Sequence, residues 1–528
     1  MSMLRAAGGM SILTLASRIL GFVRDVAMYG VFGASWVSGA FVLAWMIPNL
    51  LRRLFGEGAL SAAFIPAFTR SLRENDATAS RSLFAGVLGG ITVALFVASI
   101  VVTTAALLVP SSFWSLDPGN DPTGQATSET VGALFGELLA ILFPYVLPVC
   151  LLAIGAGALN AFGRFAAPTA APVLLNLLWI ATLLAIGDRD AAQLPAAMRT
   201  VAWALLIGGF LQLSLVAIPL RRRGMLPMPT WPAAGHPARA VFIAMVPTAL
   251  GMSVVQLNVL LDQAIATWLI GTEATNHIYL ANRLLLFPHA LVALPLATAV
   301  FPTLARHAGN SDLGAVAEQL RRAIHYTIAL ALPAAAGLAV VADELLAIGF
   351  VHGRYTEADA AVTRWTTIAL VAGLPAIGTS QLLARGFYAM GDMRTPARIA
   401  AWMVLVNVAM NLVLVGGFEA GVAGLTAATS LSAWCNSVCL RSRLRHHGVR
   451  IAVGFPAISR SVVATIAMVA AILAIERVVP AGDSRLARAL WQLVLPIIVG
   501  IGVWLLVQLW LGRELLSVIR TRLQRRRG

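Results

Sequence analysis

The residues best suited to chemistry are charged side chains that interrupt long apolar segments. Arg18, Arg24 and Asp25 lie in the first of these segments, and Arg283 lies in another near the middle of the chain. An arginine near the centre of a bilayer costs about 2.5–3.5 kcal/mol on insertion scales, so a purely structural helix has no reason to keep several. The planar guanidinium group binds two phosphate oxygens at once. These residues therefore predict a site for an anionic group, such as a diphosphate.

The end of the second apolar segment adds further polar residues to this prediction. Arg52 and Arg53 follow Asn49 within one helical turn, and Glu57 lies between two glycines just beyond them. The run from Asn49 to Arg52 resembles the residues around Arg283. Because they occupy corresponding regions of two halves of the chain, Arg52 and Arg283 are expected to face each other across a central cavity. Asn49, Arg53 and Glu57 are predicted to belong to the same substrate site.

A second set of polar residues shares helix faces in the second half of the chain: Asn258, Asp262, Asn407, Asn411, Thr426 and Thr429. Residues four apart in a helix lie on one face. One carboxylate with amide and hydroxyl oxygens suits a monovalent cation or a proton. The alternative is that these groups only hold helices together through hydrogen bonds.

Catalytic motifs are missing from the sequence. It contains no P-loop, no kinase signature and no HExxH motif, and its three cysteines lie in apolar runs without a CxxC pair. We therefore expect a protein that is not an enzyme and has no disulfide or zinc site. A membrane enzyme acting on lipid-linked sugars is the alternative, and its acid and histidine groups would come from Asp343, Glu344, His352 and Glu357.

The composition points to a membrane protein. Hydrophobic residues make up 59% of the 528 residues and charged residues only 12%, which is about half the charged share of a soluble domain. The net charge is +15 and the 38 basic residues are all arginine. These arginines are scattered between apolar runs, so membrane topology explains them better than nucleic-acid binding does.

Fourteen apolar segments are long enough to span a bilayer, which takes about 20 residues. They are 10–32, 36–55, 83–109, 132–159, 168–187, 200–220, 240–270, 277–303, 322–342, 361–388, 397–417, 421–440, 456–476 and 488–511. With both termini in the cytoplasm, 28 arginines fall inside and 7 outside. This asymmetry follows the positive-inside rule and predicts a multi-pass protein with cytoplasmic termini.

Internal similarity divides these segments into two sets. Residues 62–70 resemble 298–306 at an offset of 236, and residues 161–168 resemble 389–396 at an offset of 228. Each offset equals six segments, and an even number preserves orientation, so the halves are expected to be parallel repeats. The predicted fold is all-α, with two six-helix lobes and a C-terminal helix pair. The predicted domains are 1–222, 236–445, 452–512 and a basic cytoplasmic tail, 513–528.

Four stretches carry a resemblance to a known family. Residues 14–25 (TLASRILGFVRD), 48–66 (PNLLRRLFGEGALSAAFIP), 281–302 and 383–396 (LARGFYAMGDMRTP) resemble the MurJ (MviN) lipid II flippases of the multidrug/oligosaccharidyl-lipid/polysaccharide exporter superfamily. The likeness covers nearly the whole chain. It implies fourteen helices in two lobes, with a last pair that forms a groove for an undecaprenyl tail.

The resemblance also implies a substrate and its site. The substrate would be lipid II, the lipid-linked peptidoglycan precursor, moved from the cytoplasmic to the periplasmic leaflet of the bacterial inner membrane. The family's cavity arginines would fall on Arg18, Arg24, Arg52 and Arg283. A sodium site described for some members would fall on four residues: Asp262, Asn407, Asn411 and Thr426. The family's usual acid in the second span is replaced by Gly39, and an acid often found after the span-eight arginine is replaced by Leu286.

The expected mechanism is alternating access, with arginines gripping the diphosphate and a bend of the first helix at Gly21. Na⁺ or H⁺ binding near Asp262, or the membrane potential, would reset the cycle. No other cofactor is expected. The expected partners are lipid II and membrane lipids, with no nucleic acid, and the protein is expected to be a monomer. The alternative substrate is another polyprenyl-diphosphate-linked oligosaccharide, of the O-antigen type, or a different amphiphile.

Overall fold

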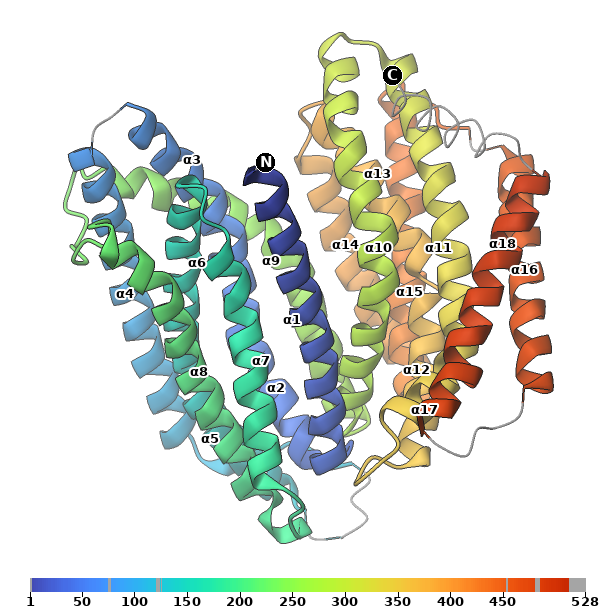
Figure 1. Ribbon diagram of the computed structural model, residues 1–528, viewed down its shortest axis with the longest axis horizontal. Coiled ribbons are helices and arrows are strands. Elements are labelled where there is room, and N and C mark those ends of the chain that lie inside the picture. The colour runs from blue at the N-terminus through green and yellow to red at the C-terminus, as the bar shows by residue number, and fades with distance from the viewer. Residues whose placement is uncertain are drawn as a thin grey trace. The chain divides into compact units, whose positions relative to one another are not determined.

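The protein is helical throughout the part of the chain that the structure describes. The computed structural model describes residues 2–74, 77–119, 124, 126–452, 454–479 and 485–511. The predicted basic tail, 513–528, lies outside these residues. The chain divides into two compact units: unit 1 contains Met1–Asn276 with His352–Tyr355, and unit 2 contains His277–Val351 with Thr356–Gly528. Figure 1 shows the helices of both units.

Unit 1 is a bundle in which α7 packs between α1 and α8, and α5 packs against α2, α4 and α8. Its elements are α1 (Ser2–Phe32), α2 (Trp36–Leu51), η1 (Arg52–Ala59), α3 (Leu60–Arg73), α4 (Ala77–Leu108), η2 (Ser111–Trp114), α5 (Ser128–Leu142), η3 (Phe143–Tyr145), α6 (Val146–Ala161), α7 (Ala166–Ile186), η4 (Ala191–Gln193), α8 (Leu194–Arg222) and α9 (Ala238–Leu269).

Unit 2 is a second bundle in which α13 packs on α11 and α15, and α12 and α14 both pack on α15. Its elements are α10 (Ala274–Gly309), whose first residues belong to unit 1, α11 (Leu313–Gly349), α12 (Glu357–Val371), α13 (Leu374–Ala389), α14 (Arg394–Asn411), η5 (Leu412–Gly417), α15 (Gly421–His446), α16 (Phe455–Val478), α17 (Arg485–Arg488), η6 (Ala489–Val494) and α18 (Leu495–Leu511).

All fourteen predicted segments fall on helices. By length and hydropathy alone, nine of the described helices can cross a membrane, or ten if the two parts of α10, bent by 50°, form one span. α1, α2, α9 and α15 do not pass this test. α2 has only 16 residues, and α1 carries the charges of Arg18, Arg24 and Asp25. The structure therefore shows a multi-pass helical membrane protein.

The second segment continues further than its sequence predicts. Instead of ending near residue 55, α2 runs through the π-helical turn η1 into α3 and stops at Arg73. α3 can continue because its aromatic side chains have a core to enter: Phe64 and Phe68 are fully buried and stack at 5.1 Å, each close to Phe84 of α4. α1 is also continuous: it forms one α-helix from Ser2 to Phe32, without a break at Gly21, the glycine at which a bend is predicted.

α9 packs in unit 1, although the sequence places it at the start of the second repeat. Val241 and Met245 of α9 belong to the same buried cluster as Phe64 and Phe84. The helix contacts α3, η1 and α4. The division into two compact units reflects contacts between helices. The predicted boundary between the repeats reflects sequence similarity between the halves, so it stays a prediction.

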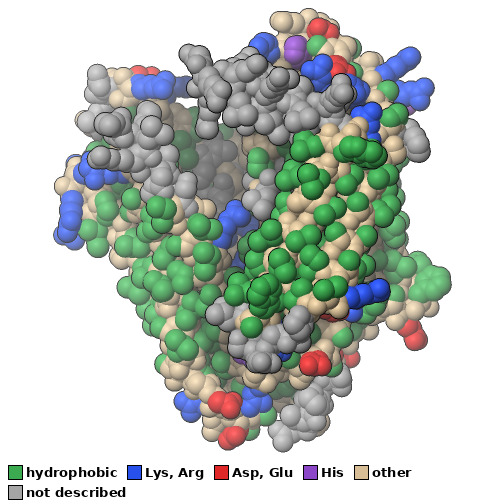
Figure 2. Space-filling model, turned by 45° about the vertical axis from the view of Figure 1, so that its right-hand side comes forward, with side chains coloured by type: hydrophobic (Ala, Val, Ile, Leu, Met, Phe, Trp, Pro, Cys, Tyr) green, Lys and Arg blue, Asp and Glu red, His purple; other side chains and the backbone are tan. Residues whose placement is uncertain are grey.

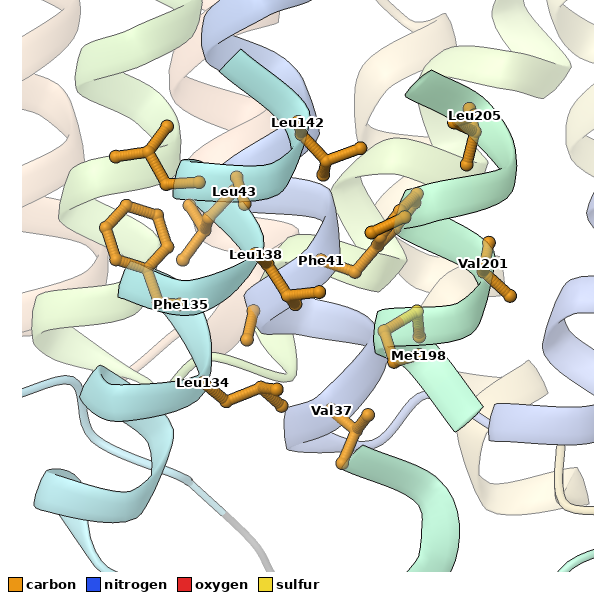
Figure 3. Packing of buried hydrophobic residues seen from close by; sticks show 14 of the residues in the cluster. Val37, Phe41, Leu43, Leu134, Phe135, Leu138, Leu142, Met198, Val201 and Leu205 are labelled. Atoms are coloured by element: carbon orange, nitrogen blue, oxygen red, sulfur yellow. The ribbon is translucent and has the colours of Figure 1, made fainter. Parts of the chain in front are cut away.

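The main core of unit 1 fills the space between α2, α5 and α8. Phe41 of α2, Leu138 of α5 and Val201 of α8 meet there, as Figure 3 shows, and each is at most 3% exposed. Transfer of such a side chain from water to an apolar interior contributes about 1.5–3 kcal/mol. This gain is made when the chain enters the membrane. Within the bilayer, close packing between the helices takes over this role.

In unit 2, the C-terminal helices α16 and α18 pack on each other and on α11. Met468 and Ile472 of α16 meet Trp504 of α18 and Val341 of α11 in one buried cluster. The outer side of the pair is apolar: Ile498, for example, is 60% exposed. On the face drawn in Figure 2, hydrophobic side chains cover most of the described surface of each unit, and many charged side chains lie toward the upper and lower edges. This distribution suits a bilayer.

The two stretches that are similar at an offset of 228 form the same turn. After α6, Gly163 has φ +70° and Arg164 N donates to Leu159 O at 2.9 Å; after α13, Gly391 has φ +81° and Asp392 N donates to Phe387 O at 3.0 Å. This is a helix C-terminal motif with glycine in the left-handed conformation. The helix pairs that precede the turns also start alike: α5 and α12 begin with threonine capping boxes at Thr127 and Thr356.

Asp392 lies two residues before α14 and caps its first turn. Its Oδ1 accepts hydrogen bonds from the backbone N–H groups of Arg394 and Thr395, each at 3.0 Å. Hydrogen bonds from the Thr395 side chain and backbone hold the pKa of Asp392 below its ordinary value. A carboxylate whose folded-state pKa is lowered stabilises the fold at pH values above its unfolded pKa, and this stability is lost as the pH falls through the folded value.

We expect Asp392→Ala to lower the free energy of unfolding by about 1 kcal/mol, the usual cost of losing side-chain capping at a helix N-terminus. The difference from wild type should persist at neutral pH and shrink below about pH 4, where the carboxylate becomes protonated. Thermal unfolding in detergent over a pH series measures this. Asp392→Asn keeps the acceptor and should retain most of the stability; an Asp392→Ala protein as stable as wild type at pH 7 would contradict the prediction.

Candidate arginine site

Arg24 lies at the centre of a buried polar cluster in unit 1. Its side chain and that of Asp25 are 10% and 4% exposed. Arg24 donates from Nε at 3.0 Å and from Nη2 at 2.5 Å, both to Oδ1 of Asp25. The sequence predicts that Asp25 shares a face with Arg18, whereas the structure places the Asp25 carboxylate on Arg24 and leaves Arg18 exposed.

Helix α7 supplies the rest of this cluster. Arg24 Nη1 donates to Asn176 Oδ1 at 3.1 Å, and Asn176 Nδ2 donates back to Ser17 O of α1 at 3.1 Å. The guanidinium lies over the ring of Trp179, 4.3 Å from its centroid. Phe41 and Trp45 of α2 hold that ring in edge-on contacts at 5.6 and 5.8 Å. α1, α2 and α7 together therefore fix the position of one cationic group.

Asn176 and Trp179 are absent from the sequence-based site. One signal was available, because Asn176 is the only strongly polar residue between Pro172 and Trp179. A lone polar group in a membrane helix is costly unless it has a partner. The sequence does not reveal that the partner is Arg24, since this depends on the packing of α1 against α7.

Trp179→Leu should lower the stability of unit 1. The substitution removes a desolvated cation–π contact, worth about 2 kcal/mol, and the aromatic packing against α2. Thermal unfolding of the purified protein measures the loss, and Trp179→Phe should retain most of the stability. Trp203→Leu is the matched control, because Trp203 is 53% exposed on α8. Equal melting temperatures for Trp179→Leu and Trp203→Leu would contradict this role.

The other predicted site residues of unit 1 lie around the π-helical turn η1. Arg52 is half-buried, and its Nε donates to Asn49 Oδ1 at 3.1 Å, one turn earlier. Arg53 is exposed. The side chain of Glu57 lies outside the described residues. π-helical turns are rare and frequently mark functional sites. The presence of η1 therefore agrees with the prediction that residues 49–57 belong to a functional site, but it does not identify a ligand.

Arg283 is the predicted site residue in unit 2. It is half-buried on α10, and its guanidinium carbon lies 6.0 Å from the ring centroid of Tyr279, one turn earlier. The neighbouring Asn282 turns its side-chain amide back to Ile278 O at 2.9 Å. Tyr279 is therefore one neighbour of the Arg283 guanidinium, on the same helix.

The residues predicted to hold a cation fall into two groups. In unit 1, Asn258 Nδ2 donates to Asp262 Oδ2 at 3.3 Å. In unit 2, Asn411 Nδ2 donates to Asn407 Oδ1 at 3.1 Å, and both side chains are fully buried. Asn407 Nδ2 lies 3.4 Å from Thr429 Oγ1 of α15.

Thr426 has different neighbours from the other residues of this set. Its hydroxyl donates to the carbonyl oxygen of Thr366 at 2.9 Å, on α12. The oxygens of Asn407, Asn411 and Thr429 are neutral ligands of the kind that suits a monovalent cation. Of their hydrogen bonds described above, the one between Asn407 and Thr429 joins α14 to α15. Within the described residues, no group of three or more His, Cys, Asp or Glu side chains is arranged to hold a metal.

Comparison with known proteins gives the family. A family model described as "Lipid II flippase MurJ" matches residues 28–504. The chain belongs to this family. It is 33% identical over 438 residues to a probable lipid II flippase MurJ of Haemophilus influenzae, covering 81% of this chain and 83% of the relative. It is also 33% identical to the lipid II flippase MurJ of Burkholderia cenocepacia, over 85% of each chain.

Solved structures show the same fold. A lipid II flippase MurJ in an inward closed conformation has a TM-score of 0.75 at 22% identity and covers 96% of this chain and 99% of its own. An inward-facing multidrug resistance MATE transporter of the MOP superfamily has a TM-score of 0.66 at 14% identity, over 83% of this chain and 97% of its own. These findings confirm the predicted family and an all-helical membrane fold of the MurJ and MATE type.

Members of this family are transporters, so the prediction that the chain is not an enzyme agrees with its family. The acids and histidine weighed for a membrane enzyme are also divided: Asp343 pairs with Arg364 at 2.6 Å in unit 2, and His352 belongs to unit 1. The match of the family model begins at residue 28, after Arg18, Arg24 and Asp25. Arg24 and Asp25 are instead supported by their burial and contacts, and Arg18, which is exposed, stays a prediction.

Proposed function

We propose that this protein flips lipid II across the bacterial inner membrane, from the cytoplasmic to the periplasmic leaflet. The observation that carries the proposal is the family match over residues 28–504. The curated relatives at 33% identity bear the same description. The buried polar cluster around Arg24 supplies a cationic group of the kind that a diphosphate-linked lipid requires.

Arg24 is the residue that we assign to the diphosphate. Two of its N–H groups already converge on one carboxylate oxygen of Asp25, which is an arrangement that a phosphate oxygen can also accept. The substrate anion would replace Asp25 as the partner of a guanidinium that Asn176 and Trp179 hold in place. Arg18, Arg52 and Arg283 would add charge to the same headgroup, with Asn49, Arg53 and Glu57 nearby.

The proposed architecture has fourteen spans, as two parallel six-helix repeats and a final pair, with both termini in the cytoplasm. Support comes from the arginine asymmetry of the sequence. Further support comes from the matching glycine turns at Gly163 and Gly391 and the matching caps at Thr127 and Thr356. Parallel repeats of this kind suit alternating access around a site at the repeat interface.

Resetting the empty transporter requires a driving force. We assign it to Na⁺ or H⁺ binding by Asp262 with the Asn407, Asn411 and Thr426 oxygens, or to the membrane potential acting on the cavity arginines. Asp262→Asn would keep the hydrogen bond to Asn258 while removing the charge, so it separates ion coupling from packing.

We also propose that the protein acts as a monomer, with the lipid tail along α16 and α18.

Rescue of a depleted host tests the function. In a strain depleted of its own lipid II flippase, this protein should restore growth and cell shape, and the Asp262→Asn variant should restore them only partially if the carboxylate carries the coupling ion. An inactive point variant, expressed and inserted to the same level, is the control. Failure of the wild-type protein to rescue, with normal insertion, would contradict the proposal.

A further inference from the structure

The connection between α8 and α9 forms a strap across the surface of α4. Residues 224–237 have no regular secondary structure, yet they are held in place along their length. Thr230 N donates to Ala85 O of α4 at 3.1 Å. His236 Nδ1 accepts from Ala238 N at 3.2 Å, and His236 Nε2 lies 3.2 Å from Ser82 Oγ.

Glycines on α4 make room for this strap. A Cβ atom at Gly89 would lie 2.1 Å from the Thr230 carbonyl oxygen, and one at Gly86 would lie 2.3 Å from the His236 ring. Such distances are far inside van der Waals contact, so the strap can approach α4 this closely only because glycine stands there. The strap is therefore a built part of unit 1.

The strap buries one set of its side chains and exposes another. Pro227 and Pro232 are buried, while Met228 is 85% exposed and Trp231 is 68% exposed. Two large apolar side chains are thus exposed within four residues of each other. Tryptophan is enriched where a protein meets the membrane–water boundary.

The charge of this region has one sign. Arg221, Arg222 and Arg223 end α8, Arg239 lies in the first turn of α9, and all four are exposed. No aspartate or glutamate occurs between residues 221 and 240. Arginines next to exposed apolar side chains are the pattern of a segment that binds anionic lipid headgroups.

The position of the strap along α4 agrees with a lipid boundary. α4 has 32 residues, so it is about 48 Å long at 1.5 Å per residue, whereas the hydrocarbon core is about 30 Å thick. Its first turns, which include Ser82, therefore extend beyond the core. The contact at Ser82 lies at this overhanging end, and the contacts at Ala85 and Gly89 follow within about two turns, so the strap runs from the headgroups to the outer part of the core.

We propose that the α8–α9 strap is a lipid anchor. Met228 and Trp231 insert at the boundary of the bilayer, and the flanking arginines bind phosphate groups of anionic phospholipids. Because the strap is fixed to α4 and leads into α9, the anchor holds the start of α9 at a constant depth. The assignment of the anchor to the cytoplasmic leaflet rests on the topology proposed above. The inference that the strap binds lipid does not depend on that topology.

Depth-dependent fluorescence quenching tests the anchor in the full chain. Cys435 and Cys439 are replaced by alanine, and the buried Cys150 is left in place. A fluorophore is attached at Met228→Cys or Trp231→Cys, and the protein is reconstituted into nanodiscs with or without anionic phospholipid. Quenchers are placed near the headgroups, deep in the acyl chains, or in the water as iodide.

We expect the headgroup-level quencher to be the most effective at both positions, with iodide having little effect. Replacing the anionic lipid by a zwitterionic one, or introducing Arg221→Gln with Arg222→Gln, should weaken headgroup quenching and increase quenching by iodide. A label at Trp203→Cys, on the exposed face of α8, should respond to the deep quencher. A label at Asn310→Cys, in an exposed connection, should respond to iodide.

Two results would overturn the proposal. Strong iodide quenching at residues 228 and 231 would show that they face water, and protection from all three quenchers would show that they are covered by protein. Gly89→Ala should displace the strap and reduce headgroup quenching. Gly502→Ala, where an added Cβ meets nothing within 4 Å, is the matched control. These readouts do not depend on transport, so they stand or fall separately from the proposed function.

Discussion

The double variant Arg24→Ala, Asp25→Ala should insert and fold but fail to flip lipid II. Removing both partners leaves no uncompensated charge in the core of unit 1, and replacement of a buried pair by apolar groups is often neutral for stability. Transport should nevertheless be lost, because the group that we assign to the diphosphate is gone. Thermal unfolding and rescue of the depleted host, measured on the same variant, separate the two effects.

The single variant Arg24→Ala should behave differently, since it leaves the Asp25 carboxylate buried without its cation. Breaking a buried pair from one side costs about 3–5 kcal/mol, so this protein should melt well below the double variant. Arg199→Ala with Glu137→Ala removes an ion pair of similar length, 2.6 Å, but with both side chains more than 40% exposed. This control should change stability by less than about 1 kcal/mol and leave transport intact. Normal rescue by the double variant would refute the assigned role of Arg24.

Substitution of Gly39 should also have a large effect. A Cβ at this position would lie 2.2 Å from the carbonyl oxygen of Thr272 and 2.7 Å from its carbonyl carbon. The Gly39 carbonyl oxygen in turn accepts from Thr275 Oγ1 at 3.3 Å, and Asn276 Nδ2 donates to Ser35 O at 3.0 Å. The start of α2 is thus in direct backbone contact with residues 272–276.

We expect Gly39→Ala to lower the free energy of unfolding by at least about 1–3 kcal/mol, the range typical of overpacking. The added Cβ clashes with backbone and not with a side chain that can rotate. Gly39→Asp, which restores the acid usual in the resembled family, should be worse, since it adds an unpaired charge to the same contact. Thermal unfolding and rescue measure both variants against Gly502→Ala, which has open space. Wild-type stability of Gly39→Asp would show that this contact is not needed.

The positions of the helices could be predicted largely from the sequence, because spans about 20 residues long need apolar side chains throughout. All fourteen predicted segments lie on helices. The continuation of α2 through η1 into α3 could not be predicted in this way, because the glycines beside Glu57 resemble a break. Only the aromatic core around Phe64 and Phe68 shows why the helix continues.

The candidate site could be predicted in part. Apolar surroundings identify Arg24 and Asp25 as unusual, but neighbouring residues on a helix normally point in different directions, so their ion pair was not expected. It forms because the long arginine side chain turns back between α1 and α7, where Asn176 and Trp179 hold it. Such contacts join residues 152 positions apart, and no local spacing reveals them.

The central claim is that this protein delivers lipid II to the outer leaflet. The most direct test follows lipid II in a host that depends on this chain and asks whether an externally added enzyme or probe can reach the precursor. With wild-type protein, most of the precursor should be accessible from outside. After depletion, or with the Arg24→Ala, Asp25→Ala variant, it should accumulate in an inaccessible form. Unchanged accessibility after depletion, in a strain shown to have no second flippase, would contradict the account.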